Sequence, residues 1–191
     1  MLIPYPPRNN RLQRTRRNLT FVVFTIALFG VQIGSAQSDE LDREKLSPKG
    51  RMAYSKLAAA CIFRVGSVGY SGETSKEELA LYDLLEEAQA LAALKSLVKT
   101  GSYEGGLYGL LGLSIRDHGE FNRAVAIYKA RKERPEPQEM RLFECFLATG
   151  ETVTTQRGCI IEVEPREKIV GAIQAGRYDR MLNAKYQPRI E

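Results

Sequence analysis

Three cysteines give the sequence its most specific chemistry, one disulfide with one thiol left over. They are Cys61, Cys145 and Cys159, and three single pairings are possible. We favour the pairing of Cys145 with Cys159, because they flank the turn at Gly150 and a hairpin there would fold Cys159 back onto the preceding helix. The closed loop would contribute roughly 3 kcal/mol to stability. Pairing of Cys61 with either of the others remains an alternative, since sequence does not determine connectivity.

The other residues that could do chemistry form no recognisable catalytic set. His118 is the only histidine, and it has no neighbouring Cys, second His or ordered carboxylate spacing to support a zinc site or a triad. The adjacent carboxylates Glu86 and Glu87 diverge by about 100° around a helix axis, which argues against a shared acid/base or metal role. We therefore predict no catalytic residue, cofactor or metal ligand. An enzyme whose site is assembled around His118 or Cys61 is an alternative.

A glycine-rich segment predicts a turn rather than a phosphate site. Gly66, Gly69 and Gly72 supply three flexible backbone positions close together. The segment lacks the Gly-Lys-Ser/Thr ending of a P-loop, does not follow a convincing strand, and does not have the Gly-x-Gly-x-x-Gly spacing of a dinucleotide site.

The amino terminus has the pattern of an export signal. An apolar run from Leu19 to Phe29 follows an arginine-rich region, and small residues precede Gln37. The run is shorter than the ~20 residues of a spanning helix. We predict a signal peptide at residues 1–36 that is cleaved between Ala36 and Gln37, with no stable membrane span afterwards. An uncleaved membrane anchor is the alternative.

The export route and the compartment follow from the same region. The segment from Thr15 to Leu19 resembles the twin-arginine signal, although an ordinary secretory signal also fits. All five surplus positive charges are arginines before residue 18, so residues 37–191 carry 23 basic and 23 acidic side chains, and a polybasic nucleic-acid binder is not supported. We expect a periplasmic or extracellular protein whose partner is an unknown envelope or extracellular protein, with no nucleic acid bound.

The first half of the exported chain predicts helices. Residues 37–47 read as a flexible leader, and Ser47 with Pro48 is a helix start signal. From Thr74, a capping box and apolar residues at spacings of three and four predict a helix that ends at Thr100. The periodicity allows either one long helix or two helices separated by a bend near Gln89.

A helical hairpin follows. Gly105, Gly109 and Gly112 fall on one helix face, which predicts close packing against a neighbouring helix. The segment from Gly106 to Leu113, with a short Asp-containing turn and the segment from Phe121 to Val125, resembles the helix pairs of HEAT-like repeats. This resemblance implies a compact helical-hairpin domain that presents surfaces to partners.

The last third changes character. A short helix is expected around Met140 to Leu147, a β-hairpin near residues 151–164 with a turn at Gln156 to Gly158, and a helix from Pro165 to Gly176. The tail at 177–191 either docks on the domain or frays. The predicted fold is therefore mainly α, a helical domain at 48–176 with a small C-terminal β-hairpin. The predicted function is that of a non-enzymatic interaction or structural domain, the alternatives being the enzyme and the membrane-anchored envelope component.

Overall fold

The computed structural model describes residues 41–132, 151–182 and 184–186. The chain divides into two units, Met1–Ala36 and Gln37–Glu191, and all described residues belong to the second. The predicted signal peptide, its cleavage position between Ala36 and Gln37, and the helix expected around Met140 to Leu147 fall outside the described residues. Within the described ranges, none of the helices has the length and apolar character needed to cross a membrane.

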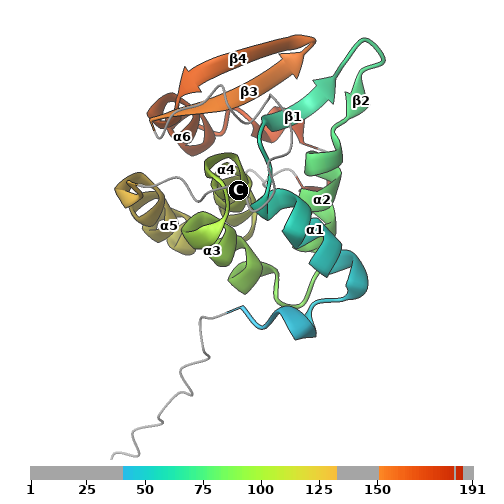
Figure 1. Ribbon diagram of the computed structural model, residues 1–191, viewed down its shortest axis with the longest axis vertical. Coiled ribbons are helices and arrows are strands. Elements are labelled where there is room, and N and C mark those ends of the chain that lie inside the picture. Colours follow the sequence, from blue (N-terminus) through green and yellow to red (C-terminus); the bar gives the residue numbers. More distant parts are fainter. Residues whose placement is uncertain (1–40, 133–150, 183, 187–191) are drawn as a thin grey trace, which may run out of the picture. The chain divides into compact units, whose positions relative to one another are not determined.

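Helices dominate the described residues, which confirms the mainly α fold class (Figure 1). The six α-helices are α1 (Pro48–Ala58), α2 (Lys76–Leu85), α3 (Ala90–Thr100), α4 (Tyr103–Arg116), α5 (His118–Ala130) and α6 (Arg166–Gln174). Three short 3-10 helices accompany them, η1 (Arg43–Lys45), η3 (Asp179–Met181) and η4 (Ala184–Tyr186).

Serine side chains begin three of these helices. Ser47 caps α1 by accepting a hydrogen bond from the Gly50 amide, with Pro48 at the first helical position as predicted. For α2, the cap is Ser75, one residue after the Thr74 expected from the sequence. Residues 86–89 separate α2 from α3, so the segment that periodicity left open forms two helices.

A four-stranded sheet completes the fold, larger than the single hairpin that the sequence predicts. The strand order is β2-β1-β3-β4; β1 pairs with β3 in parallel, and the two outer pairs are antiparallel. The predicted hairpin is confirmed as β3 and β4, but its turn lies at Cys159 rather than at Gln156 to Gly158, because β3 continues through these residues. The glycine-rich segment contains a strand that was not predicted. The strands are β1 (Phe63–Val68), β2 (Glu73–Thr74), β3 (Thr152–Gly158) and β4 (Ile160–Pro165).

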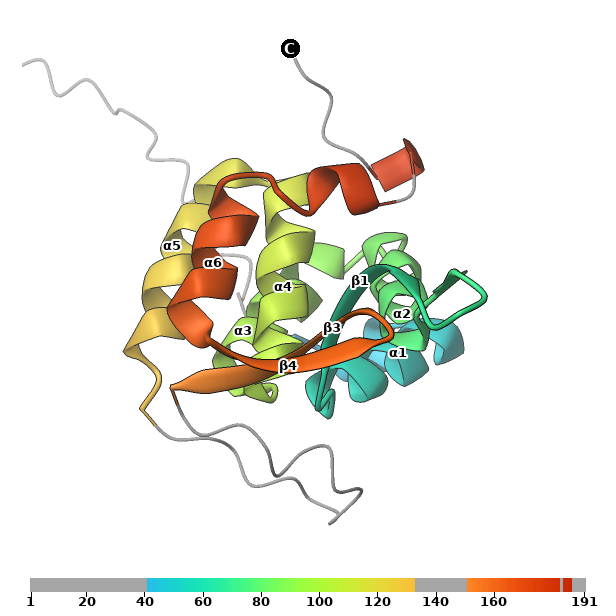
Figure 2. The same ribbon diagram turned by 90° about the horizontal axis from the view of Figure 1, so that it is seen from above.

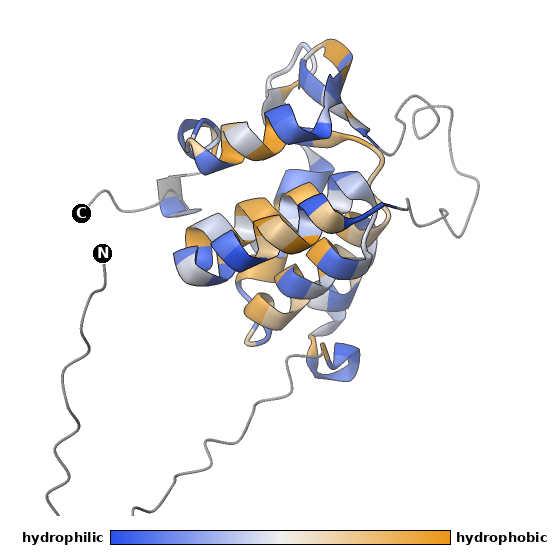
Figure 3. Ribbon diagram, turned by 90° about the vertical axis from the view of Figure 1, so that its left-hand side faces the viewer, coloured by the Kyte–Doolittle hydropathy of each residue, from blue (hydrophilic) through white to orange (hydrophobic). Residues whose placement is uncertain are grey.

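Helix α4 lies at the centre of the described domain (Figure 2). Every residue from Tyr103 to Leu113 is buried, although most helices bury only one face. Helix α4 contacts α1, α3, α5 and α6 as well as strands β1 and β3. In Figure 3, polar and apolar residues alternate along the surrounding helices, the pattern expected of amphipathic helices that cover a core.

Glycines on α4 allow this close approach, as the sequence predicts. A Cβ atom added to Gly109 would lie 2.8 Å from the carbonyl oxygen of Leu94 in α3 and 2.8 Å from Cγ2 of Val98. At Gly112 the added atom would overlap the side chain of Leu94, and at Gly105 the backbone of Leu57 in α1. Helices α1 and α3 therefore pack against α4 at a distance that only glycine permits.

The C-terminal tail docks on the domain over its described part. Helix α6 ends at Gln174, and Gly176, whose φ is +64°, follows its C-cap Ala175. Tyr178 and Leu182 are then buried, whereas Met181 stays largely exposed. Further on, the ring of Tyr186 stacks on that of Tyr82 in α2, with ring centres 4.4 Å apart.

Replacing Gly109 with alanine tests the packing of α4. We expect Gly109→Ala to lower the free energy of unfolding by about 1–3 kcal/mol, because the new methyl group meets backbone atoms of α3 that cannot move independently. Gly171→Ala in α6 is the matched control, since its Cβ would meet nothing within 4 Å. It should instead gain about 0.5–1 kcal/mol from higher helix propensity. Urea unfolding measures both values, and equal effects of the two changes would refute the packing argument.

Candidate functional site

The densest set of polar contacts surrounds an irregularity in strand β1. Phe63 pairs with Thr155 and Arg64 with Gln156 of β3, but the next pair is Val68 with Gly158. Three residues of β1 thus lie opposite a single residue of β3, which is a bulge. Within it, Gly66 has a φ of +86°, a conformation that side chains disfavour. Bulges often aim side chains at a functional site, so the surrounding groups bear on what the protein can do.

Glu78 of α2 holds this bulge from one side. Its Oε2 accepts a hydrogen bond of 2.6 Å from the amide of Gly66, and its Oε1 accepts one from the hydroxyl of Tyr82. The Glu78 side chain is almost fully buried. Burial raises the pKa of Glu78, and the hydrogen bonds from Tyr82 and Gly66 oppose that rise. Each oxygen of the carboxylate therefore accepts a hydrogen bond, one of them from the backbone of the bulge.

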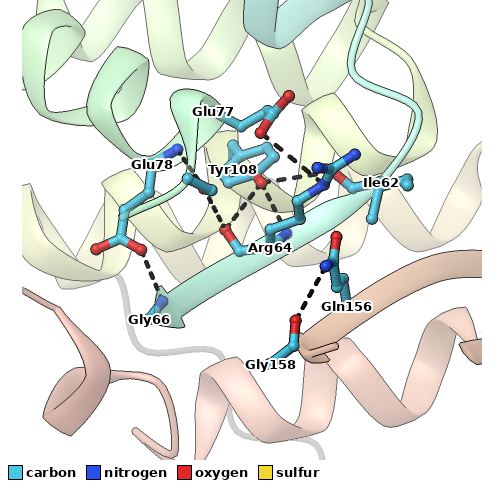
Figure 4. Close-up of polar contacts among 9 residues, drawn as sticks. Ile62, Arg64, Gly66, Glu77, Glu78, Tyr108, Gln156 and Gly158 are labelled. Carbon is cyan, nitrogen blue, oxygen red and sulfur yellow. Dashed lines mark hydrogen bonds and ion pairs between the residues drawn. The ribbon is translucent and has the colours of Figure 1, made fainter. Parts of the chain in front are cut away.

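Tyr108 of α4 holds β1 from the other side (Figure 4). Its hydroxyl accepts a hydrogen bond of 2.7 Å from the amide of Arg64, and it lies 3.0 Å from the carbonyl oxygen of the same residue, to which it donates. The hydroxyl of Ser75 also donates to that carbonyl, at 3.2 Å. Burial raises the pKa of Tyr108 well above its usual value, so the phenol stays protonated and acts as a hydrogen-bonding clamp.

The charged groups beside the clamp form no catalytic geometry. Nε of Arg64 lies 4.0 Å from Oε2 of Glu77, and both side chains are mostly buried. Gln156 donates to the carbonyl oxygen of Gly158 at 3.0 Å. A nucleophile paired with a base is not among these groups, and no cluster in the described ranges has three His, Cys, Asp or Glu side chains that could hold a metal ion.

A second buried cluster joins the ends of helices. The guanidinium carbons of Arg131 and Arg166 lie 4.9 and 4.8 Å from the centre of the Tyr103 ring. Arg131 donates to the carbonyl oxygen of Val98 at 3.0 Å, and Arg166 donates to that of Arg131 at 3.1 Å. Burial lowers the pKa of Arg131. These guanidinium groups satisfy carbonyls near the C-terminal ends of α3 and α5, which is a structural role.

Buried tyrosine hydroxyls and Glu104 complete this cluster. The Tyr128 hydroxyl donates to the carbonyl oxygen of Tyr103 at 2.8 Å. Glu104, which is fully buried in α4, accepts a hydrogen bond of 3.1 Å from the amide of Thr154 in β3. Tyr103, Tyr108 and Tyr128 are therefore core residues with bonded hydroxyls.

The residues singled out from the sequence do not come together. His118 is exposed at the start of α5, where its ring contacts that of Phe121 at 5.8 Å between centres. Cys61 is half-buried between α1 and β1 and is disulfide-bonded. Cys159 is a free, exposed thiol in the turn between β3 and β4. This free thiol disagrees with the favoured pairing of Cys145 with Cys159. Cys145 itself lies outside the described residues.

Strand β4 carries a surface that the sequence analysis did not identify. Ile160, Ile161 and Val163 are 64, 46 and 44% exposed, whereas Glu164 is buried. Glu164 accepts a hydrogen bond of 2.8 Å from the hydroxyl of Thr155, and its Oε1 forms an ion pair of 2.6 Å with Nζ of Lys168. Burial opposes ionisation of Glu164, but the Lys168 and Thr155 contacts outweigh it and lower the pKa. We call Ile160, Ile161 and Val163 the β4 patch.

A signal for this patch exists in the sequence. Adjacent residues of a strand point to opposite faces, so Ile160 and Ile161 cannot both face one core. Both side chains can be buried only if other parts of the protein pack on both faces of the sheet. Among the described residues, β4 is the last strand of the sheet and has a neighbouring strand on one side only, and Ile160 and Ile161 are exposed on opposite faces of it.

The sequence matches no protein-family model, no curated protein and no solved structure.

Removing the Tyr108 hydroxyl tests the clamp on β1. We expect Tyr108→Phe to lower the free energy of unfolding by about 1–3 kcal/mol, because the Arg64 amide loses its acceptor in a buried position. Tyr70→Phe is the control, since Tyr70 is fully exposed in the turn after β1. Chemical denaturation measures both variants. If Tyr108→Phe unfolds at the same denaturant concentration as Tyr70→Phe, the clamp does not hold β1.

The covalent framework can be tested by mass spectrometry. With Cys159 free, we expect Cys61 to be linked to Cys145, the third cysteine of the sequence. Digestion without reduction should then give a peptide joining Cys61 to Cys145, together with alkylated Cys159. Cys61→Ser should cost about 2–5 kcal/mol of stability, and Cys159→Ser should leave both the linked peptide and the stability unchanged. A linked peptide that contains Cys159 would contradict this assignment.

Proposed function

We propose that the chain is an exported, non-enzymatic binding domain that engages a partner protein through the edge strand β4. The observation that carries this proposal is the β4 patch, three exposed branched apolar side chains on one short strand at the end of the sheet.

An edge strand with exposed apolar side chains is suited to binding. Among the described residues, no strand lies on its outer side, and an edge whose amide and carbonyl groups lack a neighbouring strand is a template for pairing with another chain. Main-chain hydrogen bonds then supply affinity and the side chains supply specificity. Scattered apolar residues on a surface need no explanation, but Ile161 and Val163 are exposed on the same face of one strand, and Ile160 is exposed next to them on the other face.

The reactive groups of the described chain support binding over catalysis. The sulfur of Cys61 is held in a disulfide and cannot act as a nucleophile in that state. His118 is exposed, and the arginine, tyrosine and glutamate clusters hydrogen-bond to backbone groups of the core. An enzyme built around His118 or Cys61 therefore has no supporting geometry among the described residues.

Export and the helical architecture belong to the same proposal. We propose cleavage of a signal peptide between Ala36 and Gln37 and release into the periplasm or the extracellular space. The disulfide-bonded state of Cys61 supports an oxidising compartment. The antiparallel pair of α4 and α5 supports a HEAT-like helical hairpin, whose role is to carry the sheet and its exposed edge.

Partner capture with a matched pair of variants tests the proposal. The variant Ile161→Lys/Val163→Lys places charge on β4, and Met52→Lys/Leu79→Lys places the same charge on exposed apolar positions of α1 and α2. We expect a partner protein that the wild type and the helix variant retain and that the β4 variant loses at least tenfold, as quantified by mass spectrometry. Both variants must retain the melting temperature of the wild type within a few degrees.

Two results would overturn the proposal. Identical partners for all three proteins would show that β4 is not the binding surface. Loss of a phenotype in His118→Ala at unchanged partner capture would favour the enzyme.

A further inference from the structure

We propose that the partner of β4 is an extended segment of another protein that adds to the sheet as a fifth strand and places a basic residue opposite Glu162, between two apolar residues opposite Ile161 and Val163. This inference rests on the proposed binding function and specifies the chemistry of the partner.

The pattern of side chains on β4 sets the pattern of the partner. Ile160 and Glu162 point to one face of the sheet, and Ile161 and Val163 point to the other. On the neighbouring strand, Gln156 lies opposite Ile161 and Thr154 opposite Val163. A fifth strand with apolar residues opposite Ile161 and Val163 would cover these two exposed side chains through cross-strand pairs.

Charge around β4 explains why the partner should be basic. Lys168 and Arg157 are the cations next to the strand, and both approach Glu164, at 2.6 and 3.8 Å. Glu162 is exposed and has no ion pair with any described residue. Its carboxylate thus lies on one face of the strand without an ion pair to any described residue, and its two neighbours in sequence, Ile161 and Val163, point to the other face. A lysine or arginine directly opposite it stabilises strand pairing, whereas an acidic residue there destabilises it.

The same carboxylate argues against a second copy of this chain as the occupant. In an antiparallel pair of two β4 strands, the register that brings Ile161 opposite Val163 also brings the two Glu162 carboxylates opposite each other, which is unfavourable. Pro165 adds to this effect, because it has no amide hydrogen to donate at the end of the strand. Charges and prolines on edge strands are devices that discourage self-pairing.

Synthetic peptides test the charge rule directly. The probe is the fluorescein-labelled peptide Ser-Thr-Val-Lys-Val-Ile-Ser, with a second peptide that has Glu in place of Lys and a third that is N-methylated at the alternate residues whose amides would face β4. Binding to the purified protein is measured by fluorescence anisotropy. We expect the Lys peptide to bind about fivefold more tightly than the Glu peptide, since a favourable cross-strand ion pair replaces a like-charge pair. The N-methylated peptide should bind at least tenfold more weakly, because it cannot form the backbone ladder.

Charge reversal on the protein provides the specific control. Glu162→Lys should reverse the preference, so that the Glu peptide binds more tightly. Glu73→Lys changes an exposed acidic residue on β2, the strand at the opposite edge of the sheet, and should leave the preference as in the wild type.

Three outcomes would overturn the inference. They are equal affinity for the Lys and Glu peptides or binding of neither, a preference that Glu73→Lys rather than Glu162→Lys reverses, and a dimer in sedimentation that Ile161→Lys dissociates. If the peptides fail while the β4 variant still loses its captured partner, the binding function stands and only the chemistry of the partner is wrong. If capture is identical for all variants, the binding function itself fails.

Discussion

The close packing of α4 against its neighbours is the constraint on which the described domain depends. Glycines at 105, 109 and 112 let the backbones of α1 and α3 approach α4 until an added methyl group would overlap them. Each glycine costs roughly 1 kcal/mol of helix propensity, so contacts made at this short distance must offset that cost. Because α4 is buried along most of its length, its larger side chains reach the remaining layers. Tyr108 extends to β1, and Glu104 to β3.

These polar contacts connect the helical core to the sheet. The parallel pair of β1 and β3 brings together distant parts of the chain, and the bulge in β1 removes ladder hydrogen bonds at its centre. Glu78 and Tyr108 supply the missing partners from two different helices. The Glu78 carboxylate and the Tyr108 phenol, which resemble catalytic groups, thus compensate for an irregular strand. A buried carboxylate and a buried phenol are costly unless they are hydrogen-bonded, and here each is bonded to the backbone.

The features that could be predicted from the sequence are those set by residues close together in the chain. Helices α1, α4, α5 and α6 were predicted because capping residues and apolar periodicity are local signals, and the β3–β4 hairpin because its strands are adjacent. Strand β1 was missed because Gly66 interrupts its pattern and its partner Thr155 is remote in the sequence. The clamp of Tyr108 was not predictable for the same reason. The β4 patch could be predicted only in part. Two consecutive isoleucines of a strand cannot point to the same face, but which strand forms the edge depends on the whole sheet.

The position of β4 in this network favours binding without rearrangement. The strand is fixed on its inner side by six residue pairs with β3, and its buried Glu164 is held by Thr155 and Lys168. An added strand would therefore meet a preformed edge and pay ordering entropy only for its own residues. The polar groups that fix β4 all lie on the inner side or near its C-terminal end, and Glu162 alone is left to select charge. Affinity would come from the backbone and the apolar side chains, and discrimination between basic and acidic partner segments would come from the Glu162 carboxylate. Peptide variants can therefore measure the two contributions separately.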